Sequence, residues 1–142
     1  MKKFTALLLA LLCLAALAAC TAQQTPPEQP SSTTAIDYGE PQIVGEGATQ
    51  FVFRVTAENE KFQYLVQTDA ETVGDALLEV ELVAGTVSAG SLMVTTVCGT
   101  TLDYQKDSAY WAFHINGAYA ETGVSQTKIT PDAVYEFVYT KA

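Results

Sequence analysis

Residues 110–117 read Tyr-Trp-Ala-Phe-His-Ile-Asn-Gly, and this stretch indicates the fold more directly than any other part of the chain. Large apolar residues at positions 111, 113 and 115 alternate with the residues at 110, 112 and 114. Strict alternation of this kind is typical of a β-strand with one buried face. The Asn-Gly pair at 116–117 is the strongest short signal for a two-residue hairpin turn. The stretch therefore predicts a strand from Tyr110 to Ile115 that ends in a tight turn.

Other strand patterns lie on both sides of this stretch. Residues 50–56 and 62–66 both alternate and are separated by the polar residues 58–61, which predicts a β-hairpin. Residues 92–97 are rich in Val and Thr, and residues 134–139 alternate again after a turn at residues 130–133. The C-terminal two thirds of the chain are therefore expected to contain mainly strands and short turns.

A single helix is predicted between the hairpin and the later strands. Thr72 is a good N-cap, with Asp75 three residues later in a variant of the capping box. Apolar residues then recur at helical spacing up to Ala84, and Gly85 is a natural left-handed stop. This pattern predicts a helix of about eleven to twelve residues. The order of elements predicts an α+β domain of the β-grasp type, with one helix packed on a mixed, mostly antiparallel sheet of roughly four to six strands.

The N-terminal residues predict a location. Lys2 and Lys3 precede an apolar run over residues 4–19, which is short for a membrane-spanning helix and typical of a secretory signal peptide. Leu17-Ala18-Ala19-Cys20 resembles the bacterial lipobox, whose cysteine is acylated and becomes the first residue of the mature chain. We therefore expect a signal peptide at 1–19 and lipid attachment through Cys20 at the extracytoplasmic face of a bacterial cell membrane. The alternative is an ordinary signal peptide that is cut near Ala19 and leaves no lipid.

The next segment, residues 20–38, has the composition of a tether. It is rich in Gln, Thr, Pro and Ser, and Pro26, Pro27 and Pro30 disfavour both helix and sheet. Such a segment buries too little apolar area to offset the entropy of ordering it. We therefore expect a disordered, lipid-anchored tether over 20–38 and one folded domain over 39–142.

The charge of the chain excludes some classes of partner. Seven basic and sixteen acidic residues give a formal net charge of −9, and removal of Lys2 and Lys3 with the signal peptide gives 5 − 16 = −11. Nucleic-acid binding depends on Lys and Arg to neutralise phosphates, so we expect no nucleic-acid partner. The same charge favours a domain held away from anionic lipid headgroups.

Residues that could carry catalysis or hold a metal ion are few. With Cys13 in the signal peptide and Cys20 lipidated, Cys98 and the single histidine, His114, do not make a zinc-ligand set. Ser108 has no Gly-x-Ser-x-Gly elbow around it, and the acidic residues at 58, 60, 79 and 81 look like solvated faces. The sequence therefore predicts a protein that is not an enzyme, with no metal site and no required cofactor.

Four stretches resemble one protein family. They are Val73-Gly74-Asp75-Ala76-Leu77-Leu78, residues 110–117, Gly123-Val124, and Tyr135-Glu136-Phe137-Val138-Tyr139. Together they resemble DUF4430, the transcobalamin-like C-terminal domain of many Gram-positive surface lipoproteins, and the resemblance runs from about Gln50 to the end of the chain. The chain departs from the family at Pro131-Asp132-Ala133, where many members have Gly-Asp before the last strand.

The resemblance implies a β-grasp-like domain that binds a soluble ligand. In transcobalamin and intrinsic factor the related domain closes over one face of vitamin B12, so cobalamin or another corrinoid is the candidate ligand. Transcobalamins also carry a helical domain that supplies much of the vitamin cavity. On this resemblance we expect a half-site that binds weakly or is completed by a partner protein.

Aromatic residues around the 110–115 strand are the candidate ligand contacts. Tyr104, Tyr110 and Tyr119 combine apolar area with a hydroxyl at little entropic cost, and Trp111 belongs either to the core or to the ligand site. Gly123 and Val124 join the candidate set through the resemblance. The first hypothesis is a non-catalytic binding domain for a corrinoid. The alternative is a cell-surface module that contacts a protein or a glycan through the same aromatic residues or a sheet edge.

Overall fold

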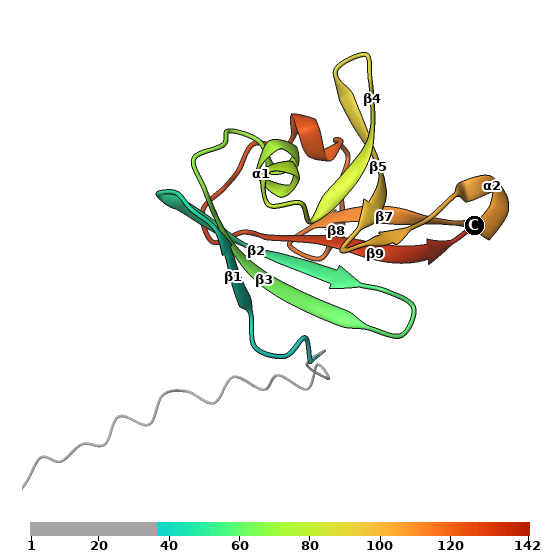
Figure 1. Ribbon diagram of the computed structural model, residues 1–142, viewed down its shortest axis with the longest axis horizontal. Helices are drawn as coiled ribbons and strands as arrows, with labels where there is room; N and C mark the ends of the chain where they lie inside the picture. The colour runs from blue at the N-terminus through green and yellow to red at the C-terminus, as the bar shows by residue number, and fades with distance from the viewer. Residues whose placement is uncertain (1–36) are drawn as a thin grey trace, which may run out of the picture. The chain divides into compact units, whose positions relative to one another are not determined.

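The computed structural model describes residues 37–142, which form a six-stranded mixed sheet, a three-stranded sheet and short helices (Figure 1). In spatial order, the larger sheet contains β1 (Gln42–Gly45), β3 (Lys61–Thr68), β2 (Thr49–Thr56), β9 (Val134–Lys141), β7 (Ala109–Ile115) and β8 (Ala118–Tyr119). The smaller sheet contains β4 (Val83–Ser88), β5 (Ser91–Val97) and β6 (Thr100–Thr101). The helices are α1 (Val73–Glu79), α2 (Tyr104–Asp107) and the 3₁₀ helix η1 (Val124–Gln126).

The predicted signal peptide, the predicted lipidation site Cys20 and the predicted tether up to residue 36 lie outside the described residues. Over residues 37–142, no helix has both the length and the apolar character needed to cross a membrane.

The centre of the larger sheet has the β-grasp arrangement that the sequence predicts. β2 and β3 form an antiparallel hairpin, the last strand β9 lies parallel to β2, and β7 pairs antiparallel with β9. α1 lies across one face of this sheet, beside η1 (Figure 1). The α+β prediction is therefore confirmed. The separate three-stranded sheet is an addition that the sequence pattern did not predict.

The predicted start of α1 is confirmed. The Thr72 side chain caps the helix, because its Oγ1 accepts a hydrogen bond from the backbone N–H of Asp75 at 3.2 Å. The same hydroxyl donates to Oδ2 of Asp75 at 2.7 Å. These two contacts satisfy one of the free N–H groups of the first turn and place a carboxylate at the positive end of the helix.

The predicted end of α1 is wrong, because the helix ends at Glu79 and not near Gly85. Glu81 takes a left-handed φ of 55°, and its N–H donates to the carbonyl of Leu78 at 3.1 Å. The N–H of Leu82 donates to the carbonyl of Leu77 at 3.0 Å. This pair of bonds is a Schellman motif, in which Glu81 occupies the position that glycine usually takes.

Gly85 lies inside β4, where it permits a close approach between strands. A Cβ at this position would lie 1.9 Å from the carbonyl oxygen of Met93 in β5. The register of the β4–β5 pair also shifts between Ala84 and Gly85, as at a β-bulge. The resulting hairpin projects from the larger sheet (Figure 1).

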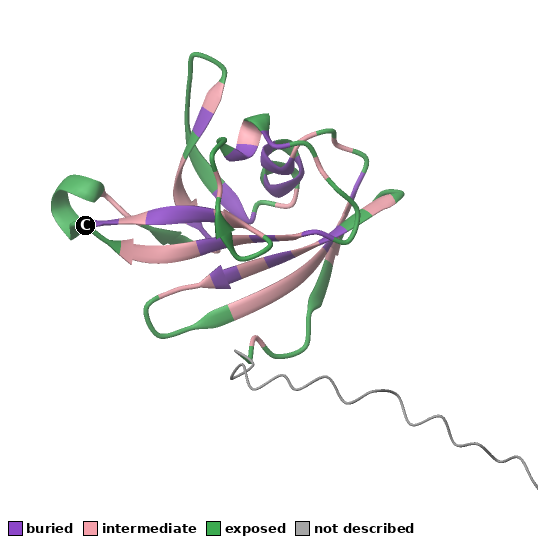
Figure 2. Cartoon of the chain, turned by 180° about the vertical axis from the view of Figure 1, so that it is seen from behind, coloured by how far each residue is buried: buried purple, intermediate pink, exposed green. Residues whose placement is uncertain are grey.

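The core lies between α1 and the face of the larger sheet turned toward it, where buried residues gather (Figure 2). The alternation predicted for residues 110–115 is confirmed, since Trp111 and Phe113 are buried on this face while His114 is half-buried on the other. Alternate residues of three strands and one face of α1 supply most of the core: Phe51, Phe53, Val55, Val73, Ala76, Leu77, Trp111, Phe113, Tyr135 and Phe137.

Tyr38 fixes the start of the described chain to the face of the larger sheet away from the core. Its hydroxyl donates to Oε1 of Glu136 at 2.6 Å and lies 3.1 Å from Oγ1 of Thr56. The guanidinium of Arg54 lies 4.7 Å from the centre of the Tyr38 ring, a cation–π distance. Burial, followed by the hydrogen bond to Glu136, raises the pKa of the Tyr38 hydroxyl. The partners alternate along β2 and β9 with core residues, which places this contact opposite α1.

Candidate ligand groove

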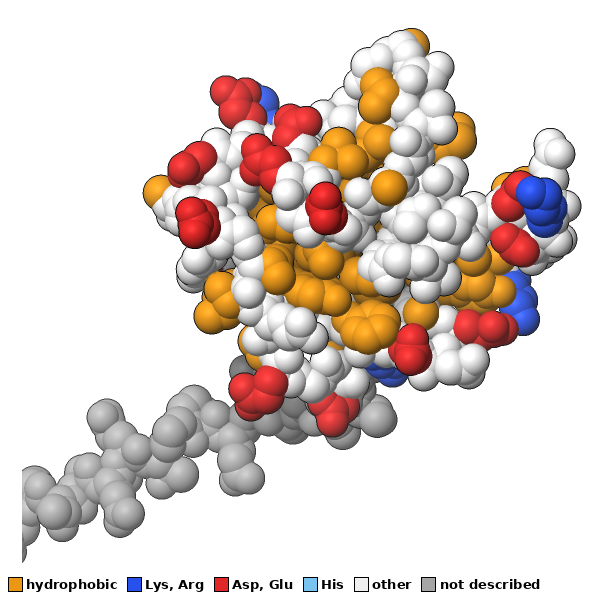
Figure 3. All heavy atoms as spheres, viewed as in Figure 1, with side chains coloured by type: hydrophobic (Ala, Val, Ile, Leu, Met, Phe, Trp, Pro, Cys, Tyr) orange, Lys and Arg blue, Asp and Glu red, His pale blue; other side chains and the backbone are white. Residues whose placement is uncertain are grey.

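Two adjoining hollows lie between the β4–β5 hairpin and the larger sheet. The first has a volume of ≈ 430 Å³ and the second of ≈ 560 Å³. Four residues, Met93 and Val94 of β5 and Tyr110 and Trp111 of β7, line both hollows, so together these form one groove, which we name the β5–β7 groove. Figure 3 shows apolar side chains gathered at the surface where the hairpin rises from the sheet.

The two strands that face each other across the groove have edges that are only partly paired. β7 pairs with β8 at His114 and Ile115, and the N–H of Ala120 then donates to the carbonyl of Phe113 at 2.9 Å. Over residues 109–112 this edge of β7 has no strand beside it within the described chain. β5 likewise pairs with β6 only at residues 96–97, which leaves residues 91–94 without a strand on the groove side. Backbone N–H and C=O groups along such edges can bind another molecule.

The rim of the groove carries large exposed apolar side chains. Met93 is 69% exposed, Tyr119 65% and Tyr104 62%. The Tyr104 and Tyr110 rings have centroids 6.4 Å apart, and the Tyr119 ring lies edge-on to His114 at 5.6 Å. Exposed apolar side chains that cluster beside a concave surface are typical of an interaction site.

Trp111 forms the floor that both hollows share. It is 7% exposed and belongs to the core, and its ring lies edge-to-face with Tyr139 at 6.4 Å. Its indole Nε1 is buried and has no hydrogen-bond partner within residues 37–142. An unsatisfied buried donor costs roughly 1–3 kcal/mol, which a hydrogen-bond acceptor placed at Nε1 would offset.

The loop with Gly123 and the helix η1 close one end of the first hollow. Gly123 and Val124 both line it, and Val124 is buried. The backbone N–H of Leu92 donates to Oγ of Ser125 at 2.8 Å, which ties β5 to η1. On the other side, α1 packs so closely on η1 that a Cβ at Gly74 would lie 2.9 Å from Cα of Ser125. η1, which forms this end of the first hollow, is therefore held by β5 on one side and by α1 on the other.

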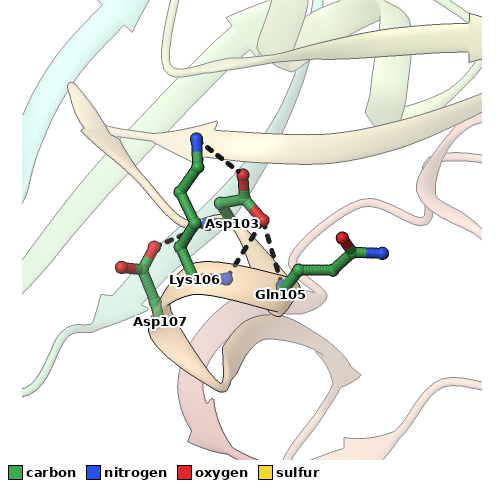
Figure 4. A network of polar contacts seen from close by, with 4 residues as sticks. All are labelled: Asp103, Gln105, Lys106 and Asp107. Atoms are coloured by element: carbon green, nitrogen blue, oxygen red, sulfur yellow. Dashed lines mark hydrogen bonds and ion pairs between the residues drawn. The ribbon is translucent and has the colours of Figure 1, made fainter.

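The short helix α2 positions Tyr104 at the rim of the second hollow. Asp103 caps it, since its Oδ1 accepts from the N–H groups of Gln105 at 3.0 Å and Lys106 at 3.3 Å (Figure 4). Its Oδ2 lies 3.1 Å from Nζ of Lys106, and Asp107 accepts a bond from the Asp103 N–H at 2.7 Å. The hydrogen bond from the Lys106 side chain contributes most to lowering the pKa of the Asp103 carboxyl group.

All six predicted ligand residues line this groove. Tyr110, Trp111, Tyr119, Gly123 and Val124 line the first hollow, and Tyr104 lines the second together with Tyr110 and Trp111. The opposite wall, which Leu92, Met93 and Val94 of β5 supply, was not predicted from the sequence. The available signal was Met93, an unbranched apolar residue in a run rich in Val and Thr. That these residues bind a ligand remains a prediction.

Residues 70–141 match the family described as a domain of unknown function, DUF4430. This chain belongs to the DUF4430 family. The match begins just before α1 and ends in β9, so it includes the whole groove. No curated protein sequence matches the chain.

Two solved structures resemble the DUF4430 chain in fold. One is a proposed metal-binding protein from Ruminococcus gnavus ATCC 29149, with a TM-score of 0.62 and 23% identity, where the match covers 67% of this chain and 99% of that one. The other is haptocorrin in complex with Cbi, with a TM-score of 0.51 and 15% identity, where the match covers 66% of this chain and 25% of the haptocorrin chain. At these identities the likeness shows a shared fold.

Metal-ligating side chains do not gather in the described part of the DUF4430 chain. Within residues 37–142 no group of three or more His, Cys, Asp or Glu residues is placed to hold a metal ion. Cys98 is half-buried, and burial raises the pKa of its thiol. His114 lies on the sheet face opposite Trp111, where its Nδ1 is buried without a partner among these residues. The groove therefore offers aromatic rings and backbone edges as its binding groups.

Proposed function

We propose that this chain is a non-catalytic lipoprotein of the bacterial cell surface, anchored through Cys20, whose β5–β7 groove binds a corrinoid such as cobalamin. The observation that carries the proposal is that six residues chosen from the sequence meet in one groove with an exposed aromatic rim. The fold shared with haptocorrin, which was solved with Cbi, supports the choice of ligand class.

The dimensions of the groove fit part of such a ligand. Each hollow lies within the range of roughly 300–1,000 Å³ that is usual for small-molecule sites. A corrin ring is a broad, largely apolar plate, and rings such as Tyr104 and Tyr119 can stack against it. The groove would cover one side of the ring and leave the other for solvent or a partner protein. The domain therefore acts as a half-site.

Equilibrium dialysis of the full-length lipoprotein in detergent against cyanocobalamin tests the ligand. We expect a stoichiometric retained chromophore at about 100 µM, where a site with a Kd of order 10 µM is mostly filled. Tyr119→Ala should weaken retention several-fold, because it removes an exposed ring from the rim. Ile43→Ala is the matched control, since it truncates an equally exposed apolar side chain on β1. No retention by the unaltered protein would contradict the proposal.

A separate experiment tests the anchor. Expression in a bacterial host with a radiolabelled fatty acid should label the full-length chain and place it in the membrane fraction. Cys20→Ser should abolish the label, whereas Cys13→Ser should leave it intact because Cys13 lies within the predicted signal peptide. A label that survives Cys20→Ser would contradict lipidation at this residue.

The second candidate function is binding of a surface protein or a glycan through the same groove. The exposed side chains of Met93, Tyr104 and Tyr119 beside unpaired strand edges favour it. This candidate becomes the leading one if cyanocobalamin is not retained and the rim variants impair adhesion of cells that display the protein.

A further inference from the structure

We propose that the β5–β7 groove selects corrinoids whose peripheral side chains are neutral carboxamides over the same ring bearing carboxylates. This inference rests on the proposed function and specifies the ligand chemistry of that same site.

The first argument comes from the strand edges. Residues 109–112 of β7 and 91–94 of β5 face the groove without a strand partner in the described chain, and on the β5 edge the Leu92 N–H is already bonded to Oγ of Ser125. A free strand edge presents both N–H donors and C=O acceptors. A carboxamide has a carbonyl acceptor and two N–H donors, so it can pair with both kinds of group, whereas an ionised carboxylate only accepts. A carboxylate placed there would leave edge carbonyls unpaired and would face their lone pairs.

The second argument comes from charge. Glu121 lines the first hollow and Asp103 lines the second, and neither hollow is lined by Lys or Arg. Lys106 of α2 is paired with Asp103 at 3.1 Å. The whole chain has a formal charge of −9. A ligand that carries several carboxylates is repelled by this surface, while a neutral amide ligand is not.

The third argument concerns the floor of the groove. The buried indole N–H of Trp111 has no partner within residues 37–142, and the ring lines both hollows. An acceptor on a ligand that reached this N–H would satisfy it, and an amide or a carboxylate oxygen could do so equally. The floor therefore favours a ligand with acceptors, and the strand edges and the charge decide in favour of amides.

Two corrinoids test the proposal as matched probes. Cobinamide carries carboxamides around its ring, and cobyrinic acid carries carboxylates on the same ring. Equilibrium dialysis of the full-length protein at neutral pH and low salt should give a Kd for cobinamide at least about tenfold lower than for cobyrinic acid. High salt should narrow the difference between the two Kd values, because it screens the repulsion between the acidic protein and the carboxylates of cobyrinic acid.

A charge variant isolates the contribution of the groove. Glu121→Gln should tighten cobyrinic acid binding several-fold, and by a larger factor than it changes cobinamide binding. Glu46→Gln is the control, since it removes the same charge from an exposed turn between β1 and β2. Equal affinity for the two probes, or tighter binding of cobyrinic acid, would overturn this inference and leave corrinoid binding intact. If neither probe binds, the proposed function fails, and this inference fails with it.

Discussion

Trp111 and Tyr119 lie on the same groove but should differ sharply in what they contribute to stability. Trp111 is 7% exposed and belongs to the core, and truncation of a buried Trp to Ala costs about 3–5 kcal/mol. Trp111→Ala also removes an indole N–H that has no partner in residues 37–142, which relieves a penalty of about 1 kcal/mol or more. We therefore expect a loss near the lower limit, about 3 kcal/mol. Tyr119 is 65% exposed, so Tyr119→Ala should change stability by no more than about 0.5 kcal/mol.

Urea unfolding followed by far-ultraviolet circular dichroism measures both variants on one scale. Tryptophan fluorescence is unsuitable here, because Trp111 is the single tryptophan in the chain. A loss of about 3 kcal/mol in a small domain corresponds to a fall in Tm of at least about 12 °C. The reasoning is refuted if Trp111→Ala costs less than about 1 kcal/mol, or if Tyr119→Ala unfolds the domain as readily.

Three further predictions concern the supports of the groove. Thr72→Ala should cost about 1 kcal/mol in urea unfolding, because it removes the N-cap contacts with Asp75, and an unchanged midpoint would show that the cap is dispensable. Gly85→Ala should force β4 away from the Met93 carbonyl and cost about 1–3 kcal/mol, with faster hydrogen exchange in β4 and β5; unaltered exchange would contradict the close approach. Burial raises the pKa of Tyr64 to about 12, above its ordinary value of 10.0, so the folded state keeps this proton when the unfolded state has lost it. The free energy of unfolding should therefore decline as pH rises from about 10 to 12, and Tyr64→Phe should remove part of that decline. The same pH dependence of stability in the unaltered protein and in Tyr64→Phe would contradict this prediction.

The strands with strict alternation were predictable from the sequence. β2, β3, β7 and β9 each turn one face into the core, so every second residue is mostly apolar, and the period appears directly in the chain. The start of α1 was also predictable, because Thr72 and Asp75 form a local contact. Four of the candidate ligand residues could be chosen in advance because they are aromatic and lie in or near one such strand and its turn, whereas Gly123 and Val124 came from the family resemblance.

The remaining elements depend on contacts that a local pattern does not contain. The prediction of where α1 ends was wrong because Glu81 adopts a left-handed conformation. Burial of the next residue, Leu82, stabilises this conformation. β4 is exposed along most of its length, so it has no apolar alternation to reveal it. The β5 wall of the groove arises from the packing of two separate sheets, which brings Leu92 close to Ser125 across a long stretch of chain. Such long-range pairing is visible only in three dimensions.

The spatial order of the strands has a mechanical consequence. β1 is at one edge of the larger sheet, and β7, which carries the floor of the groove, is separated from it by β3, β2 and β9. A pull transmitted through the N-terminal end would load β1 and the Tyr38 contacts before any other part of the fold. Because Tyr38 binds Thr56 of β2 and Glu136 of β9, part of such a load would bypass the edge strand and enter the middle of the sheet, one strand away from β7.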